Sequence, residues 1–519
     1  MTRSIGRDRR LVTHPAAGGS EDARTLARRP HVVVVGGGIA GLAAATGLAE
    51  RGVSVEVIER ESYLGGRVGA WSERTDDGAD VSMSRGFHAF FRQYYNLRQL
   101  LRRTDPQLRR LTALEDYPLI DAHGRVDGFR GLPRTPPWNA IAFALRSPTF
   151  RVRDLVKMNP RAAAPLAMVS VPEIFHQLDN VDAEAFLLSI NFPEPARHLA
   201  FDVFSRSFFA APTDMSAAEL ATMFHIYFLG SNEGLVFDVP ESAFDTSLWN
   251  PLRAYLERLG VEFRMDTTVS SIEATAGDTF VVEHDSGSTT ADGVVLSTDV
   301  GALRGIVERS PTLGDPTWRD QVARLRSAPK FLVVRQWLDR PVAETRSPFL
   351  GTGGLPPLDN ISILDSYERE AAEWARTKGG TVVELHAYAA HSHESGKTDG
   401  EIRDQLVARL HKLYPETADA KVVHESTLWR EDCPLFGLGD FATRPTVSTP
   451  HSRLVLAGDG IRIDLPVALM ERAATTGWRA ANVLLSSWKL AGHDTYTVPT
   501  SGRSRPLRWL GTRAAKERT

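Results

Sequence analysis

The sequence contains a single cysteine, Cys433, among its 519 residues. One cysteine excludes an intramolecular disulfide framework and suits a reducing compartment. Cys433 could still be a reactive thiol, but a lone cysteine followed by Pro434 is more typical of an inert one.

Long apolar runs and an excess of one charge are also missing. No stretch reaches the roughly 18 to 20 uninterrupted apolar residues of a transmembrane helix, so any membrane contact is expected from one side only. The 61 basic and 64 acidic residues give a net charge of -3, which offers no general reason to expect nucleic acid as a partner. No C-x-x-C or H-E-x-x-H spacing is present, and we expect no metal site.

Both ends of the chain are rich in arginine. Residues 1–30 contain seven arginines and no apolar run, so they lack the core of a secretory signal, and we expect a disordered extension. Residues 491–519 form a basic C-terminal tail with Leu507, Trp509 and Leu510, which could touch a membrane or be disordered.

Residues 31–59 alternate as strand, glycine turn, helix and strand. "HVVVV" is a β-branched run, "GGGIAGLAAATGLAERG" has helix-forming composition, and "VSVEVIE" is a second strand. Such a βαβ unit predicts an α/β fold with a parallel, Rossmann-like sheet. We expect this dinucleotide-binding domain to comprise residues 31–90, 246–304 and 446–490. Residues 91–245 and 305–445 would form an inserted α+β substrate domain.

The glycine turn carries the pattern G-x-G-x-x-G at Gly36, Gly38 and Gly41. The first glycine permits a tight turn, the second lets a pyrophosphate approach the backbone, and the third lets helix and strand pack closely. Glu59 ends the second strand, where a carboxylate can accept both hydroxyls of an adenosine ribose; a solvated strand end is the alternative. The predicted cofactor site also includes the neighbouring residues Ile39, Ala40 and Arg60.

Two further segments favour FAD over NAD. "LGGRVGAW" places Gly65, Gly66 and Arg67 just after the second strand, where they can approach phosphate or the flavin edge. "LAGDGIRIDLPVALMERAATTG" places Gly458 and Asp459 after a late strand, and Asp459 suits a ribityl hydroxyl. The helix expected to begin near Pro466, with Val467 and Ala468, would direct its N-terminus at the flavin pyrimidine.

Together these segments resemble the FAD-containing amine oxidase and phytoene desaturase superfamily, from residue 31 to about residue 490. The resemblance implies a glutathione reductase-type FAD-binding domain and a backbone contact from Val269 to adenine. The C-terminal motif of this superfamily is close to P-x-x-x-G-A-x-x-S-G, and here it reads "PVALMERAATTG". This departure restricts the resemblance to a smaller subgroup of the superfamily.

Three other segments resemble carotenoid enzymes. "GFHAFFRQYYNL" resembles plant-type carotene desaturases, whereas "WREDCPLFGLGDFATRPTV" and "PVALMERAATTGWRAAN" resemble carotene β-ring desaturase/methyltransferases, the isorenieratene synthases. The latter resemblance implies aromatisation of a β-ionone ring with one methyl group moving from C1 to C2. A linear carotene or hydroxysqualene-type desaturase is the alternative enzyme, and a non-catalytic isoprenoid-binding protein is the alternative from another class. No NAD site is evident, so a quinone or oxygen is the expected electron acceptor.

The aromatic segment at residues 85–97 is either ordinary core or the wall of an apolar site. Its position soon after Arg67 favours a wall near the flavin, with His88 as a candidate for proton transfer or as a supporting histidine. Asp464 could face the flavin, cap a helix or pair with Arg462. The candidate substrate contacts are Phe87, Phe90, Phe91 and Tyr94.

A possible membrane-binding helix follows residue 136. Trp138, Ile141, Ala142 and Leu145 fall on one helical face. An apolar face rimmed by basic side chains suits an anionic lipid surface, although such a helix can also pack on its own domain. The resemblance favours the membrane, and with it a cytoplasmic protein held peripherally at the inner face of the cell membrane. The surrounding basic residues are Arg134, Arg146, Arg151, Arg153, Lys157 and Arg161.

Overall fold

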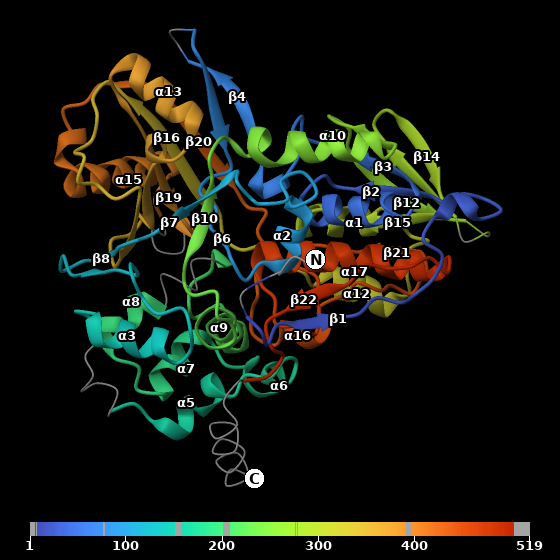
Figure 1. Ribbon diagram of the computed structural model, residues 1–519, viewed down its shortest axis with the longest axis horizontal. Coiled ribbons are helices and arrows are strands. Elements are labelled where there is room, and N and C mark those ends of the chain that lie inside the picture. The colour runs from blue at the N-terminus through green and yellow to red at the C-terminus, as the bar shows by residue number, and fades with distance from the viewer. Residues whose placement is uncertain are drawn as a thin grey trace.

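In the computed structural model, residues 6, 8–75, 78–150, 157–200, 208–275, 277, 279–390 and 396–502 are described. A five-stranded parallel sheet lies on the right of Figure 1, with strand order β11-β3-β2-β15-β21. Its central strands are β-branched and buried on both faces, as is usual where helices cover a parallel sheet. The strands are β11 Val261–Arg264, β3 Ser54–Ile58, β2 His31–Val35, β15 Gly293–Leu296 and β21 Leu454–Leu456.

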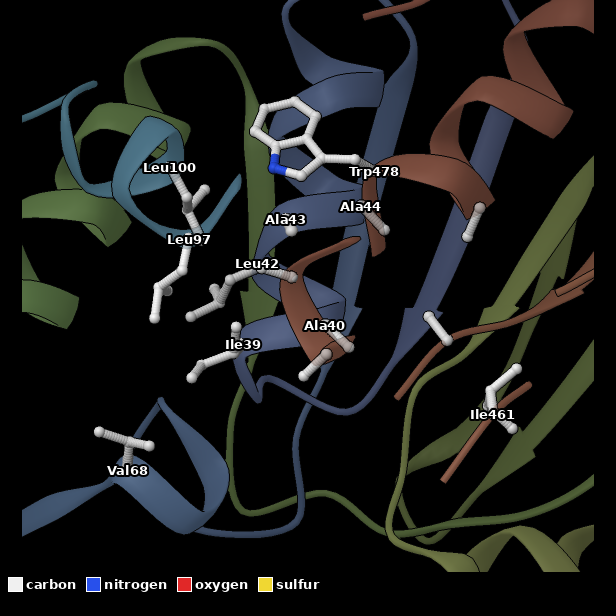
Figure 2. Packing of buried hydrophobic residues seen from close by; sticks show 14 of the residues in the cluster. Ile39, Ala40, Leu42, Ala43, Ala44, Val68, Leu97, Leu100, Ile461 and Trp478 are labelled. Carbon is white, nitrogen blue, oxygen red and sulfur yellow. The ribbon is translucent and has the colours of Figure 1, made fainter. Parts of the chain in front are cut away.

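Helix α1 (Ile39–Ala49) is buried along its whole length and packs against α17 (Leu469–Ser487). Small residues permit this close approach: a Cβ on Gly477 would lie 2.2 Å from the Ala40 carbonyl oxygen. Figure 2 shows Trp478 of α17 above α1, and Leu97 and Leu100 of α2 (Tyr95–Leu101) beside it. The dinucleotide-binding turn thus rests on a rigid, tightly packed helix pair.

Smaller elements complete this half of the molecule. An antiparallel three-stranded sheet has the order β12-β13-β14, and β4 pairs with β5. The elements are β12 Val269–Ala274, β13 Phe280–His284, β14 Gly287–Ala291, β4 Ala70–Arg74, β5 Asp80–Ser84, α10 Asn250–Arg258, α11 Val300–Glu308 and α12 Pro316–Ala323.

The second half is built on a seven-stranded sheet at the upper left of Figure 1, with order β20-β16-β19-β18-β17-β8-β9. Its pairs are antiparallel except β17 with β8. Strands β16 and β19 are fully buried. The strands are β20 Val422–Arg430, β16 Phe331–Leu338, β19 Thr381–Ala387, β18 Asn360–Ile363, β17 Phe349–Gly353, β8 Leu119–Asp121 and β9 Val126–Asp127, with helices α13 Arg369–Lys378 and α15 Asp399–Leu413.

A helical group lies below this sheet, and a small antiparallel sheet, β6-β10-β7, joins it to the rest of the molecule (Figure 1). The apolar residues of α3 face outward: Trp138 is 62% exposed, Ile141 44% and Leu145 65%. Asn139, by contrast, is buried and donates to the Phe228 carbonyl at 2.9 Å. The helices are α3 Trp138–Arg146, α5 Pro160–Ala167, α6 Glu173–Leu178, α7 Ala183–Ser189, α8 Arg197–Ala200, α9 Ala217–Phe224 and α16 Asp440–Thr443; the strands are β6 Phe90–Phe91, β10 Phe237–Pro240 and β7 Leu111–Leu114.

The α/β class and the parallel sheet with an added α+β part confirm the expected fold. All five parallel strands come from the three stretches 31–90, 246–304 and 446–490. Two expected boundaries cut through elements, however: position 90/91 falls inside β6, and 304/305 falls inside α11. Helix α12 also packs on α11, so it belongs to the parallel-sheet half.

The expected disorder of residues 1–30 was wrong for the described part of that segment. Strand β1 (Val12–His14) pairs antiparallel with β22 (Thr495–Thr497), and His14 Nε2 lies 2.9 Å from Thr497 Oγ1. The partner strand comes from the other end of the chain, which local composition does not indicate. The tail is likewise folded up to residue 502, where the Val171 N–H donates to the Thr500 carbonyl. Residues 503–519 and the arginines 151 and 153 lie outside the described residues.

Within the described ranges, no helix has both the length and the apolar character needed to cross a bilayer.

Candidate active site

The turn between β2 and α1 lines one end of a cavity of about 560 Å³. Gly36 has a φ of +104°, and a Cβ there would lie 2.8 Å from the Ser297 carbonyl oxygen. Gly38 is the N-cap of α1 and has no side-chain cap, and a Cβ on it would meet only the Gly66 Cα, at 3.9 Å. Gly41 faces the turn instead, where a Cβ would lie 1.9 Å from the Gly36 carbonyl oxygen. The three glycines therefore give a tight turn, an open helix N-terminus and close packing.

Glu59 follows β3 and lines the same end of the cavity. Its carboxylate accepts the backbone N–H groups of Gly37 at 2.6 Å and Glu61 at 2.9 Å. Burial raises the pKa of Glu59. Arg60 lines the cavity beside it and pairs with Asp299 at 3.2 Å.

The Gly65-Gly66-Arg67 segment lies directly beside the turn and lines the same cavity. Gly65 has a φ of +95°, and a Cβ there would lie 2.2 Å from Trp249 Nε1, so no other residue fits. Its N–H donates to the Gly37 carbonyl at 2.9 Å, which ties the two glycine segments together. Arg67 forms an ion pair with Asp459, and both side chains line the cavity.

Two segments that are distant in sequence from the glycine turn also line the cavity. Gly458 and Asp459 do so directly after β21, and Val269 does so at the start of β12. Helix α17 begins at Leu469, three residues after the expected start, and its N-terminus has no side-chain cap. The lining residues there are Leu469, Met470 and Ala473. The buried residues just before the helix are not among the lining residues: Pro466, Val467 and Ala468.

Asp464 lies outside the cavity lining. Its carboxylate pairs with Arg462 at 3.0 Å and is half-exposed, which matches the salt-bridge alternative. The helix cap alternative does not describe its position, because α17 begins five residues later.

The other end of the cavity is aromatic. Phe87 packs against Phe349 with ring centres 4.5 Å apart, and Phe91 packs against Tyr227 at the same separation. Tyr94 lines the cavity, and its hydroxyl lies 2.6 Å from that of Tyr227. Phe90 is buried behind this wall, on β6, and is not among the lining residues, because alternate residues of a strand point to opposite faces.

His88 lines the cavity between the two ends. Its Nδ1–H donates to the Gly86 carbonyl at 2.8 Å, which leaves Nε2 without a proton. Burial lowers the pKa of His88 to about 4, so the imidazole is neutral near pH 7.

Several lining residues were not anticipated, among them Asn360 and Tyr388 of the antiparallel sheet. Cys433 also lines the cavity, and burial raises the pKa of its thiol to about 12, in keeping with an inert cysteine. In the described part of the chain, no group of His, Cys, Asp and Glu side chains is arranged to hold a metal ion. The further aromatic lining residues are Tyr117, Phe208, Phe209, Phe237, Phe331 and Phe436.

The cofactor end fits a dinucleotide. A helix N-terminus without a cap suits a phosphate group, and open space beside Gly38 admits it. A buried carboxylate suits ribose hydroxyls. The same cavity extends from this end to the aromatic end, whose mostly apolar lining suits an apolar ligand.

Comparison with known proteins agrees with this geometry. Residues 39–485 match the family model of flavin containing amine oxidoreductases. Cyclohexylamine oxidase from Brevibacterium oxydans shares the fold with a TM-score of 0.63 and 17% identity, covering 89% of this chain and 100% of that one. The chain therefore belongs to the flavin-containing amine oxidoreductase family.

Within that family, the sequence is similar to carotenoid phi-ring synthases. It is 54% identical to the phi-ring synthase of Streptomyces griseus, covering 97% of each chain. It is 26% identical to that of Chlorobaculum tepidum, covering 93% of this chain and 92% of the other.

Proposed function

We propose that this protein is a carotenoid phi-ring synthase, which oxidises the β-ring of a carotenoid such as β-carotene to an aromatic ring and moves one methyl group from C1 to C2. The 54% identity over 97% of both chains carries this proposal. The aromatic chamber that opens onto a dinucleotide site supports it, because both are needed to oxidise an apolar ring.

We infer that the cofactor is FAD. Glu59 would accept the ribose hydroxyls, the turn at Gly36 and Gly38 would hold the pyrophosphate, and Arg67 with Asp459 would lie beside the ribityl and flavin part. When bound, the flavin accepts hydride from the substrate ring. Aromatising one ring removes four hydrogens, so each ring needs two oxidation rounds and an electron acceptor, for which a quinone or oxygen is suited.

The chain's own residues would position the ring and stabilise positive charge on it. Loss of hydride leaves a cation, a 1,2-methyl shift relieves the quaternary carbon, and loss of a proton gives unsaturation. The rings of Phe87, Phe237 and Phe349 line the chamber and pack against one another edge-on or tilted, and a ring face turned toward the substrate would attract such a cation. The mostly apolar walls limit access of water, which would otherwise trap the cation.

We further infer that α3 docks on an anionic membrane surface from one side. Its outward face carries Trp138, Ile141 and Leu145, and exposed Leu188 of α7 adds to the apolar residues of this helical group. A side that exposes tryptophan and leucine and buries asparagine suits the boundary between headgroups and acyl chains. Exposed basic side chains on α3, α5 and the segment between them would contact the headgroups: Arg146, Lys157 and Arg161.

Stacked aromatic rings connect α3 with the chamber. Phe143 of α3 stacks on Phe129 at 5.2 Å, Phe129 on Tyr117 at 4.2 Å, and Tyr117 contacts Phe237 at 4.7 Å. These packed rings place α3 close to the chamber, which supports α3 as the side from which a carotenoid enters from the bilayer. We include in this proposal a peripheral position at the inner face of the cell membrane.

Expression in a cell that makes β-carotene, followed by pigment analysis, tests the proposed function. We expect carotenoids with aromatic rings. Unchanged β-carotene, together with dehydrogenation of an acyclic carotene in a parallel strain, would identify a linear desaturase instead. Purified protein without flavin absorption, and without gain on addition of FAD, would indicate a non-catalytic isoprenoid-binding protein.

A further inference from the structure

Three polar residues alternate along β19 and the position that follows it. Glu384, His386 and Tyr388 are two residues apart, so their side chains share one face of the strand. Glu384 and His386 are buried, whereas Tyr388 lines the cavity. This row therefore runs from the interior of the sheet to the wall of the proposed substrate site.

Hydrogen bonds join the row from end to end. Arg335 donates to Glu384 Oε2 from Nε at 2.9 Å and from Nη2 at 2.5 Å. His386 Nε2 lies 2.8 Å from Glu384 Oε1, and His386 Nδ1 lies 2.6 Å from the Tyr388 hydroxyl. Burial favours a neutral Glu384, but Arg335 and His386 outweigh burial and lower the pKa of Glu384 to about 2.

The ionised carboxylate decides the direction of these bonds. A carboxylate only accepts, so the 2.8 Å contact places the proton of His386 on Nε2. The Phe87 N–H lies 3.2 Å from Nε2 and cannot donate to it when Nε2 is protonated; the shorter contact with the charged carboxylate decides the tautomer. His386 Nδ1 is then free to accept the Tyr388 O–H.

Tyr388 is held at a defined place on the cavity wall. Asn360 Nδ2 donates to its hydroxyl at 3.1 Å, and its ring meets Phe209 edge-on at 4.7 Å. The ring also packs with the cluster that contains Cys433, whose thiol lies beside Arg67. Tyr388 thus lines the cavity together with aromatic residues of the chamber and with Cys433, which lies beside Arg67.

We propose that Tyr388 accepts the proton that the substrate ring loses during aromatisation, and that His386 and Glu384 are positioning residues for that transfer. This inference rests on the proposed function. The ring C–H bond breaks, its electron pair forms the new ring double bond, and the proton moves to the Tyr388 oxygen. The original Tyr388 proton moves to His386 Nδ1, and Glu384 stabilises the imidazolium that results. The substrate cation becomes neutral, and His386 carries the positive charge. Its extra proton passes to solvent before the next round.

Other polar groups of the cavity are less suited to this task. His88 lines the cavity, but its Nδ1 donates to the Gly86 carbonyl and has no carboxylate behind it. Asp359 already accepts the Tyr388 N–H, and Asp459 and Asp432 pair with arginines. Tyr388 is the cavity hydroxyl with an imidazole and an ionised carboxylate directly behind it.

Comparison of Tyr388→Phe with the wild-type protein tests the proposal. Two rates are compared: flavin reduction, seen as loss of flavin absorption on anaerobic mixing with β-carotene, and aromatic product formation, measured by quench and pigment analysis. The second rate is taken in a parallel reaction with an added quinone, because the two oxidation rounds of each ring need an electron acceptor. We expect the ratio of product formation to flavin reduction to fall by roughly 100-fold or more, the range of a general base. Tyr414→Phe is the matched control, since Tyr414 is buried in the core of the same domain and does not line the cavity.

An unchanged ratio in Tyr388→Phe would overturn the relay, including the case in which both rates fall together. A wild-type protein that forms aromatic rings, combined with an unchanged ratio in the variant, overturns the relay alone. A wild-type protein that reduces flavin but forms no aromatic ring overturns the proposed function and the relay with it.

Glu384→Gln tests the positioning role. Without the carboxylate, the imidazolium formed at His386 loses the charge that stabilises it, so we expect the ratio of product formation to flavin reduction to fall while the rate of flavin reduction stays as in the wild type. An unchanged ratio would contradict this role. The substitution removes the charged partner of buried Arg335, so circular dichroism first checks that the variant folds. The Tyr388→Phe comparison does not depend on this variant. The other charged or titratable groups that interact with Glu384, His386 or Tyr388 are not substituted in this variant: Arg335, Tyr367, Glu368, His88, Asp359 and Cys433.

Discussion

Glu59 is the side chain through which flavin affinity can be tested most directly. Its carboxylate is buried, oriented by two backbone N–H groups, and open to the cavity. We expect Glu59→Gln to weaken FAD binding by about 1.5–3 kcal/mol, because a charged acceptor becomes neutral. Fluorescence titration of the apoprotein with FAD measures this, and Glu273→Gln, exposed on β12, is the control. Equal affinities in the two variants would remove Glu59 from the site.

The same carboxylate makes a pH prediction. Burial raises the pKa of Glu59, so its protonation on acidification begins at a higher pH than that of an ordinary glutamate. The charged form binds the ribose hydroxyls better, and wild-type affinity for FAD should therefore fall as the pH is lowered through this raised pKa. The Glu59→Gln protein should lack this dependence, and a parallel fall in both would contradict the assignment.

His88 should act in its neutral form. With a pKa of about 4, it stays unprotonated between about pH 6 and pH 8, and no inflection of turnover in that range should come from it. We expect His88→Gln to lower turnover at every pH by a similar factor while the flavin stays bound, as checked by pH–rate profiles and flavin absorption. Normal turnover in the variant would exclude His88 from the mechanism.

At the scale of elements, the β2-turn-α1-β3 unit could be predicted because its signals are contiguous in sequence. Gly36, Gly38 and Glu59 act through local backbone geometry, and the structure brings them to one end of a cavity. The row of Glu384, His386 and Tyr388 was missed although "TVVELHAYA" reads as a strand. Its E-x-H-x-Y spacing places the three on one face, but which face meets the cavity depends on strands distant in sequence.

Helix α3 supplies the element-scale prediction. Trp138→Glu combined with Leu145→Glu should abolish flotation with anionic liposomes, because each apolar side chain contributes about 1.5–3 kcal/mol when buried in the interface. Both residues are exposed, so thermal stability should change by less than about 0.5 kcal/mol. Val422→Glu, an exposed apolar position on β20, is the matched control. Wild-type protein that does not float would contradict the membrane assignment.

At the scale of the molecule, the sequence predicted two parts but not how they share one cavity. Gly38 and Glu59 come from the parallel-sheet half, whereas Asn360 and Tyr388 come from the antiparallel sheet. The pairing of β1 with β22 was also out of reach, since it joins segments almost 500 residues apart. Long-range pairings leave no local pattern, and they account for most of what sequence reasoning missed.

The shared cavity predicts that FAD stabilises the whole chain. At a free concentration of about 100 times Kd, binding contributes about 2.7 kcal/mol and should raise the Tm by ~2–3 °C. Differential scanning calorimetry with and without FAD measures this, with flavin release followed by fluorescence. A single transition that shifts as a whole is expected, and a second transition insensitive to FAD would contradict it.

The parallel sheet also sets an order of events during synthesis. Strands β2 and β3 leave the ribosome early, yet their sheet is completed by β21, at Leu454–Leu456. At ~5–20 residues per second, the roughly 400 intervening residues delay β21 by roughly 20 to 80 seconds. Strand β15 emerges roughly 160 residues before β21, so at ~5–20 residues per second its valine-rich edge has no partner strand for roughly 8 to 32 seconds and is open to chaperones or to aggregation. Yield of this enzyme in a foreign host should therefore respond to translation speed and chaperone supply before it responds to flavin supply.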